Sequence, residues 1–358
     1  MGVCLSAELM PLKQWERIAM TPFPLPTPEM VADYDDLSDH SKLPQKVDVS
    51  VIVLAYNHRQ FIAECLDSIV RQKTRFVFNI ILSDDGSSDG TRDICQEYQR
   101  KYPSLIRLVA AKHNHKRLGV AKRVEDAIAD HARYVMWCEG DDYWLDDQKI
   151  QKQIECLDAH QDVDACAARF RTFYSQENRL DSEQDSLGGG YVRRIFRNGF
   201  EFLHRNTLCV RLGAYREISE YINRTGIEYD LTVLLLLELG RGVYVLPDVV
   251  SVYRWTGLGV WTSWSPDEKR ARHLQNMYQM AHALDFPKSI YFYSALLCEY
   301  CSCLRIFCKR WDAPSLVLAL VRVMQYSLLY PVSLLYAAMY VALPKVLRKV
   351  RRTCRIGK

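Results

Sequence analysis

The pattern of apolar positions changes character near residue 47. From there to about residue 160, short apolar runs alternate with stretches in which apolar residues recur at helical spacing. The runs predict strands at residues 48–55, 78–83, 105–111 and 134–138, and the intervening stretches predict helices at residues 59–71, 91–101, 120–131 and 146–160. Because strands this apolar need cover on both faces, the alternation predicts an α/β, Rossmann-like domain with a mostly parallel central sheet and flanking helices.

The flanking segments have other patterns. Residues 1–46 are rich in proline and then in aspartate, which predicts an extension with little regular structure that is mobile or wraps a surface. Residues 161–265 are less regular, with a glycine loop at 188–190, a helix expected at 230–239 and a strand at 242–246. Residues 266–358 read as helices. We therefore divide the chain into residues 1–46, 47–160, 161–265 and 266–358.

Composition narrows the function classes only slightly. A net charge of +4 on 358 residues is too small to indicate a nucleic-acid partner. The 12 cysteines favour reduced thiols in a cytosolic protein, because the order of residues after Met1 is not that of a secretory signal. Cys298 and Cys301 have C-x-x-C spacing but lie in an expected helix at 291–311, which favours buried small hydrophobes over a zinc site.

The C-terminal end carries a candidate membrane-contacting segment. Residues 326–343 contain no charged side chain, and about 18 residues is the lower limit for crossing a bilayer. Because Pro331 interrupts this stretch and Arg322 precedes it, an interfacial helix or hairpin is favoured over a true span; a core helix with a solvated basic tail is the alternative. The tail that follows is attracted to anionic membrane surfaces through Lys345, Arg348, Lys349, Arg351, Arg352, Arg355 and Lys358.

The residues that follow each expected strand are the ones to inspect, because ligands bind beyond the carboxyl ends of parallel strands. Tyr56, Asn57 and His58 follow the first strand, where a dinucleotide or methyl-donor loop would have glycines. A nucleotidyltransferase, which shares this kind of sheet, would have a glycine-rich basic loop there. His113 and His115, after the third strand, are interpreted as polar loop residues, with contact to a diphosphate as the alternative.

Two acidic clusters follow the second and fourth strands. Asp84 and Asp85 end the second strand, where a carboxylate could accept hydrogen bonds from a nucleobase N–H or from ribose hydroxyls; an acidic turn is the plainer alternative. Glu139, Asp141 and Asp142 follow the fourth strand and repel one another unless a cation or protons neutralise them. Mg²⁺ typically binds through one or two carboxylates plus substrate phosphates, so this cluster predicts a metal site that a diphosphate completes.

These segments together resemble the family 2 glycosyltransferases with the GT-A fold, especially bacterial members that build surface polysaccharides. The resemblance covers roughly residues 47–262 and includes the opening strand 51–57 and the block from Cys138 to Trp144 followed by Asp147 and Lys149. It implies that Tyr56 and Asp85 hold the base and ribose of the donor. The nucleotide site would also include Asn57, Asp84, Gly119 and Arg123.

The resemblance also implies the remaining roles. Asp141, with Glu139 or Asp142, would bind Mg²⁺ or Mn²⁺ on the donor diphosphate. Asp230 would be the general base, with Glu228 in reserve, although Asp230 also reads simply as a favourable acid in the first turn of an apolar helix. A flexible loop over the donor would include Arg254, Thr256 and Trp261.

We therefore expect an inverting, metal-dependent glycosyltransferase. Its donor would be a UDP- or dTDP-linked sugar, and its acceptor a saccharide or lipid-linked saccharide in surface polysaccharide synthesis. Residues 47–160 would bind nucleotide and metal, residues 161–265 the acceptor, and the helical end the cytoplasmic face of the inner membrane. Thr256 and Arg123 depart from the family pattern, where histidine and asparagine are usual. A catalytically silent GT-A module that binds a sugar nucleotide or a partner glycosyltransferase is therefore the alternative.

Overall fold

The computed structural model describes residues 10–115, 118, 120–128, 132–181, 190–192, 203–226, 233, 236–237, 240–257, 264–284, 288–310 and 312–329. The chain separates into two compact units. One unit comprises residues 24–257, and the other combines residues 1–23 with residues 258–358. We describe each unit by itself.

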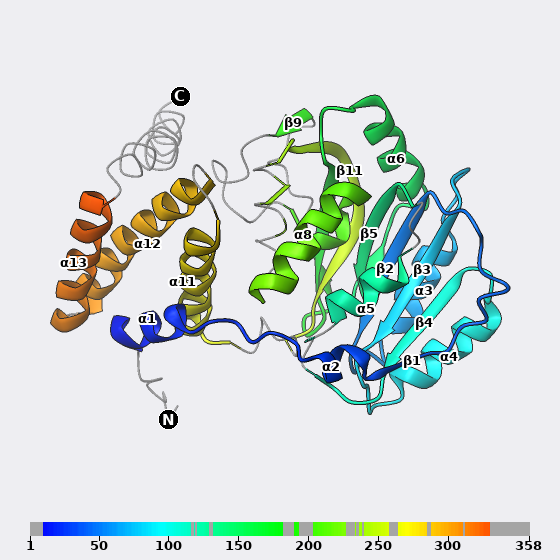
Figure 1. Ribbon diagram of the computed structural model, residues 1–358, viewed down its shortest axis with the longest axis horizontal. Coiled ribbons are helices and arrows are strands. Elements are labelled where there is room, and N and C mark those ends of the chain that lie inside the picture. Colours follow the sequence, from blue (N-terminus) through cyan, green and yellow to red (C-terminus); the bar gives the residue numbers. More distant parts are fainter. Residues whose placement is uncertain are drawn as a thin grey trace. The chain divides into compact units, whose positions relative to one another are not determined.

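A single mixed sheet organises the unit of residues 24–257 (Figure 1). Its described strands lie in the order β1 (Tyr34–Asp36), β4 (Ile106–Ala111), β3 (Phe78–Asp84), β2 (Val49–Ala55), β5 (Tyr134–Glu139), β10 (Cys209–Arg211), β7 (Ala165–Tyr174), β11 (Val243–Trp255) and β6 (Tyr143–Trp144). The short β8 (Arg179–Leu180) pairs with β7, and β9 (Gly190–Val192) pairs with β11. The four strands predicted from the apolar runs are parallel neighbours, which confirms the expected sheet.

Antiparallel strands extend this parallel core on both sides. β1 pairs with β4, and β10 lies between β5 and β7, in each case antiparallel. β7 and β11 are parallel to each other, with irregular pairing between Val245 and Ser251. The sequence did not predict β10, because three residues are too few to show a strand period.

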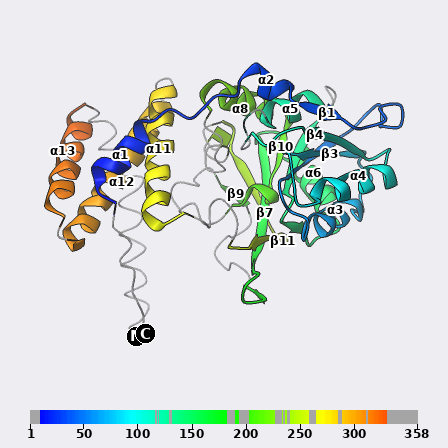
Figure 2. The same ribbon diagram turned by 90° about the horizontal axis from the view of Figure 1, so that it is seen from below.

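Helices cover both faces of the sheet (Figure 2). α3 (Ile62–Val70), α4 (Thr91–Lys101) and α6 (Lys149–Ala159) pack on one face, and α5 (Val120–Ala127) and α8 (Leu212–Thr225) on the other. Alternation along β2 explains this arrangement, because Val51 and Val53 point to the first face and Ile52 to the second. All three side chains are at most 1% exposed.

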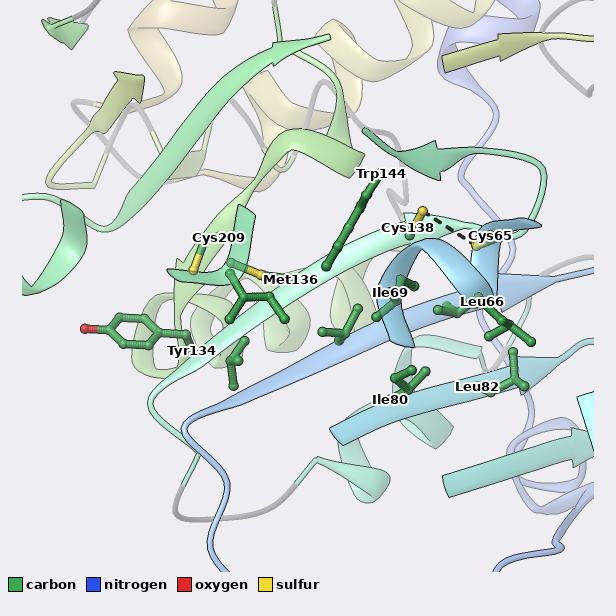
Figure 3. Packing of buried hydrophobic residues seen from close by; sticks show 14 of the residues in the cluster. Cys65, Leu66, Ile69, Ile80, Leu82, Tyr134, Met136, Cys138, Trp144 and Cys209 are labelled. Carbon is green, nitrogen blue, oxygen red and sulfur yellow. Dashed lines mark hydrogen bonds between the residues drawn. The ribbon is translucent and has the colours of Figure 1, made fainter. Parts of the chain in front are cut away.

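Several cysteines pack in the core as small apolar residues (Figure 3). Cys65 on α3 lies beside Cys138 on β5, with their sulfurs 3.6 Å apart, and Cys209 lies in the same cluster. Burial raises the pKa of the Cys138 thiol well above its usual value. The Cys138 thiol is therefore a protonated packing group.

The N-terminal residues contain more regular structure than their composition predicts. Residues 24–46 include α2 (Pro28–Ala32) and β1, which extends the sheet edge beside β4. Residues 12–20 form α1 (Leu12–Met20) in the other unit, with Leu12 and Trp15 fully buried. The expectation of little regular structure was wrong for these segments, because packing against a preformed surface outweighs the local proline and aspartate content.

The second unit is helical (Figure 1). α1 packs with α11 (Pro266–Ala283), α12 (Lys288–Arg310) and α13 (Ala313–Leu329). A capping box at Ser265 and Glu268 begins α11. The helices expected at 291–311 and from 313 onward are confirmed as far as Leu329. The Cys301 side chain is exposed, so the prediction that the cysteines of the C-x-x-C pair are buried was wrong for this residue. The Cys298 side chain lies outside the described set.

Within the described segments, no helix has both the length and the apolar character to cross a membrane. Residues 330–358, which hold Pro331 and the basic tail, lie outside the described residues. Membrane contact therefore remains a prediction.

Candidate active site

The carboxyl ends of three parallel strands meet where the order of the sheet reverses. β3 and β4 lie to one side of β2, and β5 lies to the other. In the registers of these pairs, Ala55 is opposite Asp84 and Leu54 is opposite Glu139. The two acidic loops expected from the sequence thus emerge on either side of β2, at the position where ligands bind in open α/β sheets.

An arginine neutralises Asp84. The Asp84 side chain is fully buried, and its Oδ2 accepts hydrogen bonds from Arg92 Nε at 2.8 Å and from the Ser87 backbone N–H at 3.3 Å. Its Oδ1 is also buried and has no hydrogen-bond partner within the described part of the chain. Asp84 therefore anchors the start of α4 to the end of β3.

A second arginine neutralises Asp85. Arg123 Nη2 donates to Asp85 Oδ1 at 3.0 Å, and the Asn114 amide donates to Asp85 Oδ2 at 3.2 Å. Arg123 is fully buried, with the Tyr34 ring 5.9 Å from its guanidinium carbon. Its Nε and Nη1 are buried without a hydrogen-bond partner among the described residues. A ligand at Asp85 would therefore meet a carboxylate already paired with a cation.

Close packing fixes the loop that contains these acids. Gly86 has φ +76°, and a Cβ there would lie 2.5 Å from the Asn114 backbone nitrogen, so only glycine fits. On the other side, Asn57 joins β2 to the same loop: its backbone N–H donates to Ser87 Oγ and its side-chain oxygen accepts from Ser88 N–H. Tyr56 is 44% exposed beside this junction. The structure thus brings together Tyr56, Asn57, Asp84, Asp85 and Arg123.

Asp142 in the second acidic loop is internal. It is 1% exposed; its Oδ1 accepts from the Arg254 backbone N–H at 2.7 Å and its Oδ2 from the Asn206 amide at 3.0 Å. Burial, reinforced by the charge of Asp141, raises the pKa of the Asp142 carboxyl well above its usual value. Asp142 therefore holds the loop after β5 to β11.

Asp141, by contrast, is presented to solvent. Its side chain is 23% exposed, and its Oδ2 lies 3.9 Å from His58 Nε2. In the part of the chain that is described, no lysine or arginine pairs with this carboxylate. Arg254 contacts the backbone carbonyl of Asp141 at 2.8 Å and directs its other Nη to Glu64 at 2.6 Å. The carboxylate therefore keeps its capacity for an external cation.

Gly140 brings His58 against this loop. A Cβ at Gly140 would lie 2.7 Å from His58 Nδ1 and 2.9 Å from the Leu54 carbonyl oxygen. His58 Nδ1 is itself buried and has no hydrogen-bond partner among the described residues. Glu139, the remaining acid, has its Oε1 3.7 Å from Arg205 Nη1.

The donor set fits Mg²⁺ or Mn²⁺ on a diphosphate better than a cage made by protein alone. No group of three or more His, Cys, Asp or Glu side chains within the described ranges converges as a metal site. Asp141 supplies one solvent-facing carboxylate, whereas both oxygens of Asp142 already accept hydrogen bonds. One carboxylate plus phosphate oxygens is a common arrangement for such ions.

Four candidate residues, namely Glu228, Asp230, Gly119 and Trp261, lie outside the described residues. Thr256 follows β11 and is 9% exposed. His113 and His115 both contact Asp33 Oδ2, at 3.0 and 2.7 Å, so they attach the loop after β4 to the N-terminal segment.

Sequence reasoning missed several residues that build the site. Arg92, Asn114 and Arg205 pair with the acids, and Asn206 supports Asp142. His58 is the third residue after β2; the sequence placed it after the strand but gave it no role beside Asp141. Asn206 shows no signal in the sequence, because it reaches Asp142 from a short 3-10 turn 64 residues later.

Comparisons with known proteins identify similar sequences and folds. Residues 50–215 match the model of glycosyl transferase family 2. The chain is 31% identical over 225 residues to an uncharacterized protein of Mycobacterium tuberculosis, covering 62% of this chain and 63% of that protein. It is 29% identical over 248 residues to the putative teichuronic acid biosynthesis glycosyltransferase TuaG of Bacillus subtilis, covering 67% of this chain and 91% of the relative. The match thus spans less than two thirds of the mycobacterial protein.

Solved structures with similar folds include TarS 1–349 of S. aureus in complex with UDP-GlcNAc, with a TM-score of 0.55 and 18% identity over 87% of this chain and 92% of that one. The mannosyltransferase PcManGT of Pyrobaculum calidifontis, in complex with GDP-Man and Mn²⁺, has a TM-score of 0.50 and 17% identity over 93% and 92%. At this identity the likeness establishes the fold alone. The expected GT-A fold is confirmed, and residues 50–215 match the glycosyl transferase family 2 model.

Proposed function

We propose that the protein transfers a sugar from a nucleoside-diphosphate sugar to an acceptor hydroxyl, with inversion of configuration. The match to the family 2 model supports glycosyl transfer, and the relative TuaG is named a putative teichuronic acid biosynthesis glycosyltransferase. The acceptor we propose is a saccharide, carried on a lipid, in such a synthesis.

One observation favours an active donor site above all others. Asp141 lies at the reversal point of the sheet with a partly exposed carboxylate that no described lysine or arginine neutralises. A carboxylate in that position can coordinate a divalent ion that binds together with a diphosphate.

We assign the metal to Asp141, with Glu139 as a second or water-mediated ligand. A bound Mg²⁺ or Mn²⁺ would offset the negative charge that grows on the leaving diphosphate. PcManGT, solved in complex with GDP-Man and Mn²⁺, is a precedent for this pairing. The protein's own part is to orient Asp141 through the Arg254 contact to its carbonyl and the Asp142 anchor.

We assign the nucleoside to the first acidic loop. Tyr56 offers an exposed aromatic face, and Asp85 offers a carboxylate fixed by Arg123 and Asn114. TarS is named with UDP and RfbG of Shigella flexneri as a dTDP-rhamnosyl transferase, which supports a UDP- or dTDP-linked donor.

Asp230 is our candidate general base, with Glu228 in reserve. As the acceptor oxygen attacks the anomeric carbon, its proton would pass to Asp230. General-base catalysis contributes about 10²- to 10⁴-fold in rate, so Asp230→Asn should nearly abolish turnover while leaving nucleotide affinity intact. Turnover equal to that of the parent would transfer the role to Glu228 or elsewhere.

The test of the donor site is isothermal titration of the full chain with UDP, GDP, dTDP and CDP, in Mn²⁺ and then in chelator. We expect tight, metal-dependent binding of one of these nucleotides, which would also identify the base of the donor. Binding of none of the four would contradict the assignments of Asp85 and Asp141.

A second candidate function is a catalytically silent module that binds a sugar nucleotide or a partner glycosyltransferase. The fully buried Arg123 favours it, because this residue already occupies one oxygen of Asp85. Thr256, in place of the usual histidine, points the same way. Donor hydrolysis or transfer above a control without protein would rule this alternative out.

A further inference from the structure

A polar pocket lies inside the helical unit, among the four helices α1, α11, α12 and α13. It encloses about 500 Å³ of empty space with its open mouth included. Each of the four helices contributes to its lining, which consists of Glu16, Ala19, Met20, Tyr278, His282, Tyr300, Arg322, Gln325 and Tyr326.

The charged groups of this pocket compensate one another. Arg322 donates to Glu16 through Nε at 2.7 Å and through Nη2 at 3.2 Å, and the Tyr300 hydroxyl donates to the same carboxylate at 3.1 Å. Because the carboxylate and the guanidinium are paired, the pocket presents no net charge. Phosphate or a nucleotide would have to displace Glu16 from Arg322, which leaves a buried carboxylate unpaired.

Two polar groups in the lining are available to a ligand. Gln325 accepts from Arg322 Nη1 at 2.6 Å through its Oε1, so its amide Nε2 is held in place. In the described part of the chain, neither this Nε2 nor the Tyr278 hydroxyl has a hydrogen-bond partner. A ligand that both donates and accepts hydrogen bonds would satisfy them.

Aromatic rings form much of the remaining lining. Tyr300 and Tyr326 stack with centroids 5.7 Å apart and planes at 22°, and Tyr278 lies against His282 with centroids 4.1 Å apart and planes tilted by 33°. The faces of such rings carry partial negative charge and attract the weakly positive C–H groups of a pyranose ring. Apolar faces combined with fixed, neutral hydrogen-bonding groups suit a ligand with a C–H face and a rim of hydroxyls.

We propose that this pocket binds a neutral saccharide unit and is a second carbohydrate site, separate from the site where sugar is transferred. This inference rests on the proposed function only for the source of the saccharide, which would be a repeat of the acceptor glycan. Holding one repeat on the helical unit would raise the local concentration of the glycan for the transfer domain.

The test is saturation-transfer NMR on the full chain with the neutral methyl glycosides of glucose, mannose, rhamnose and N-acetylglucosamine, and with uridine and inorganic phosphate as comparison probes. We expect at least one glycoside to bind, and phosphate not to bind at the pocket. Tyr278→Ala and Gln325→Ala should each lower the affinity for that glycoside about threefold to tenfold. Met324→Ala is the matched control, because Met324 adjoins Gln325 but is 64% exposed and outside the pocket.

The outcomes separate this proposal from the proposed function. Glycoside binding that weakens about threefold to tenfold in Gln325→Ala and is unchanged in both Met324→Ala and Asp141→Asn supports the pocket. Three results would overturn the proposal. They are no binding of any glycoside, binding in both pocket variants that equals binding in the parent, and loss of binding in Asp141→Asn alone. If Tyr278→Ala does not fold, Gln325→Ala decides alone. Failure of the donor site would instead appear as absent metal-dependent nucleotide binding, which pocket variants leave unchanged.

Discussion

The two acidic loops beside β2 have similar sequences and opposite electrostatic environments. In the loop after β3, Asp84 is paired with Arg92 and Asp85 with Arg123, and both carboxylates are at most 5% exposed. In the loop after β5, Asp142 accepts hydrogen bonds from neutral N–H donors, and His58 Nε2 lies 3.9 Å from Asp141 Oδ2. The first loop therefore has two carboxylates paired with arginine, whereas the Asp141 carboxylate has no such partner among the described residues.

This difference shows why acidic motifs with similar spacing can have different roles. A carboxylate paired with arginine is held in a fixed position, which suits an acceptor of hydrogen bonds from a base or ribose. A carboxylate without a cation has an unfavourable charge until a metal arrives, which suits a site completed by its ligand. Four substitutions test this comparison.

Asp141→Asn should have the largest effect. The amide keeps the shape of the side chain but loses the charge that would hold a divalent ion, so we expect transfer to fall by about 10²- to 10³-fold. Titration with the nucleotide that the parent binds should show that the Mn²⁺-dependent part of the affinity is lost. Equal Mn²⁺-dependent affinity in variant and parent would remove Asp141 from the metal site.

Arg123→Met should cost the most folding stability. It leaves Asp85 buried without its cation, and breaking a buried pair in this way costs about 3–5 kcal/mol in the free energy of unfolding. Urea denaturation measures the loss, and adding Asp85→Asn should restore much of it. The matched control is Lys122→Met, which removes an exposed pair with Asp126 and should cost about 1 kcal/mol or less. Equal losses in the two variants would show that Asp85 does not depend on Arg123.

Lys149 is a cationic residue that follows the second acidic loop, and its contacts show whether it neutralises an acid of that loop. The lysine is fully buried, donates to Gln153 at 2.7 Å and lies over Trp144 at 4.2 Å, so it serves neither Asp141 nor Asp142. Burial lowers the pKa of Lys149 from 10.5 to about 8. Between these values the unfolded chain binds a proton that the folded chain does not, so this group makes the free energy of unfolding rise with pH.

Lys149→Met should remove that contribution. The difference in unfolding free energy between parent and variant should change by on the order of 3 kcal/mol in the parent's favour from pH 8 to pH 10.5. Lys152→Met is the opposite control. Its hydrogen bonds with Asp146 and Asp248 raise the pKa of Lys152, so the stabilising contribution of this lysine is lost as the pH rises through its raised pKa. A parent–variant difference for Lys149 that is flat with pH would mean that its charge is already compensated.

The sequence predicted the parallel core and the two loops because both depend on local information. Apolar runs such as 49–55 and 78–84 become buried strands wherever they pair, and acids directly after them must lie at one edge of the sheet. The different roles of Asp141 and Asp142 were not predictable, because they depend on Asn206 and Arg254, which come 64 and 112 residues later. The structure of residues 12–20 likewise depends on distant helices, as the contact of Glu16 with Arg322 illustrates.

Asp142→Asn should have the smallest effect and bears most directly on the comparison. The asparagine oxygen can keep the hydrogen bond from Arg254 N–H, and the loss of a buried charge offsets the weaker contact to Asn206, so stability should change by about 1 kcal/mol or less. Nucleotide affinity in Mn²⁺ should stay close to that of the parent. Asp142→Ala is the companion variant, because it leaves the Arg254 N–H buried without its acceptor and leaves the Asn206 amide with only the Val252 carbonyl at 3.3 Å among its described acceptors, so it should cost about 2–4 kcal/mol. If Asp142→Asn instead abolished metal-dependent binding as Asp141→Asn is expected to, Asp142 would be the metal ligand and the loop would rearrange when the donor binds.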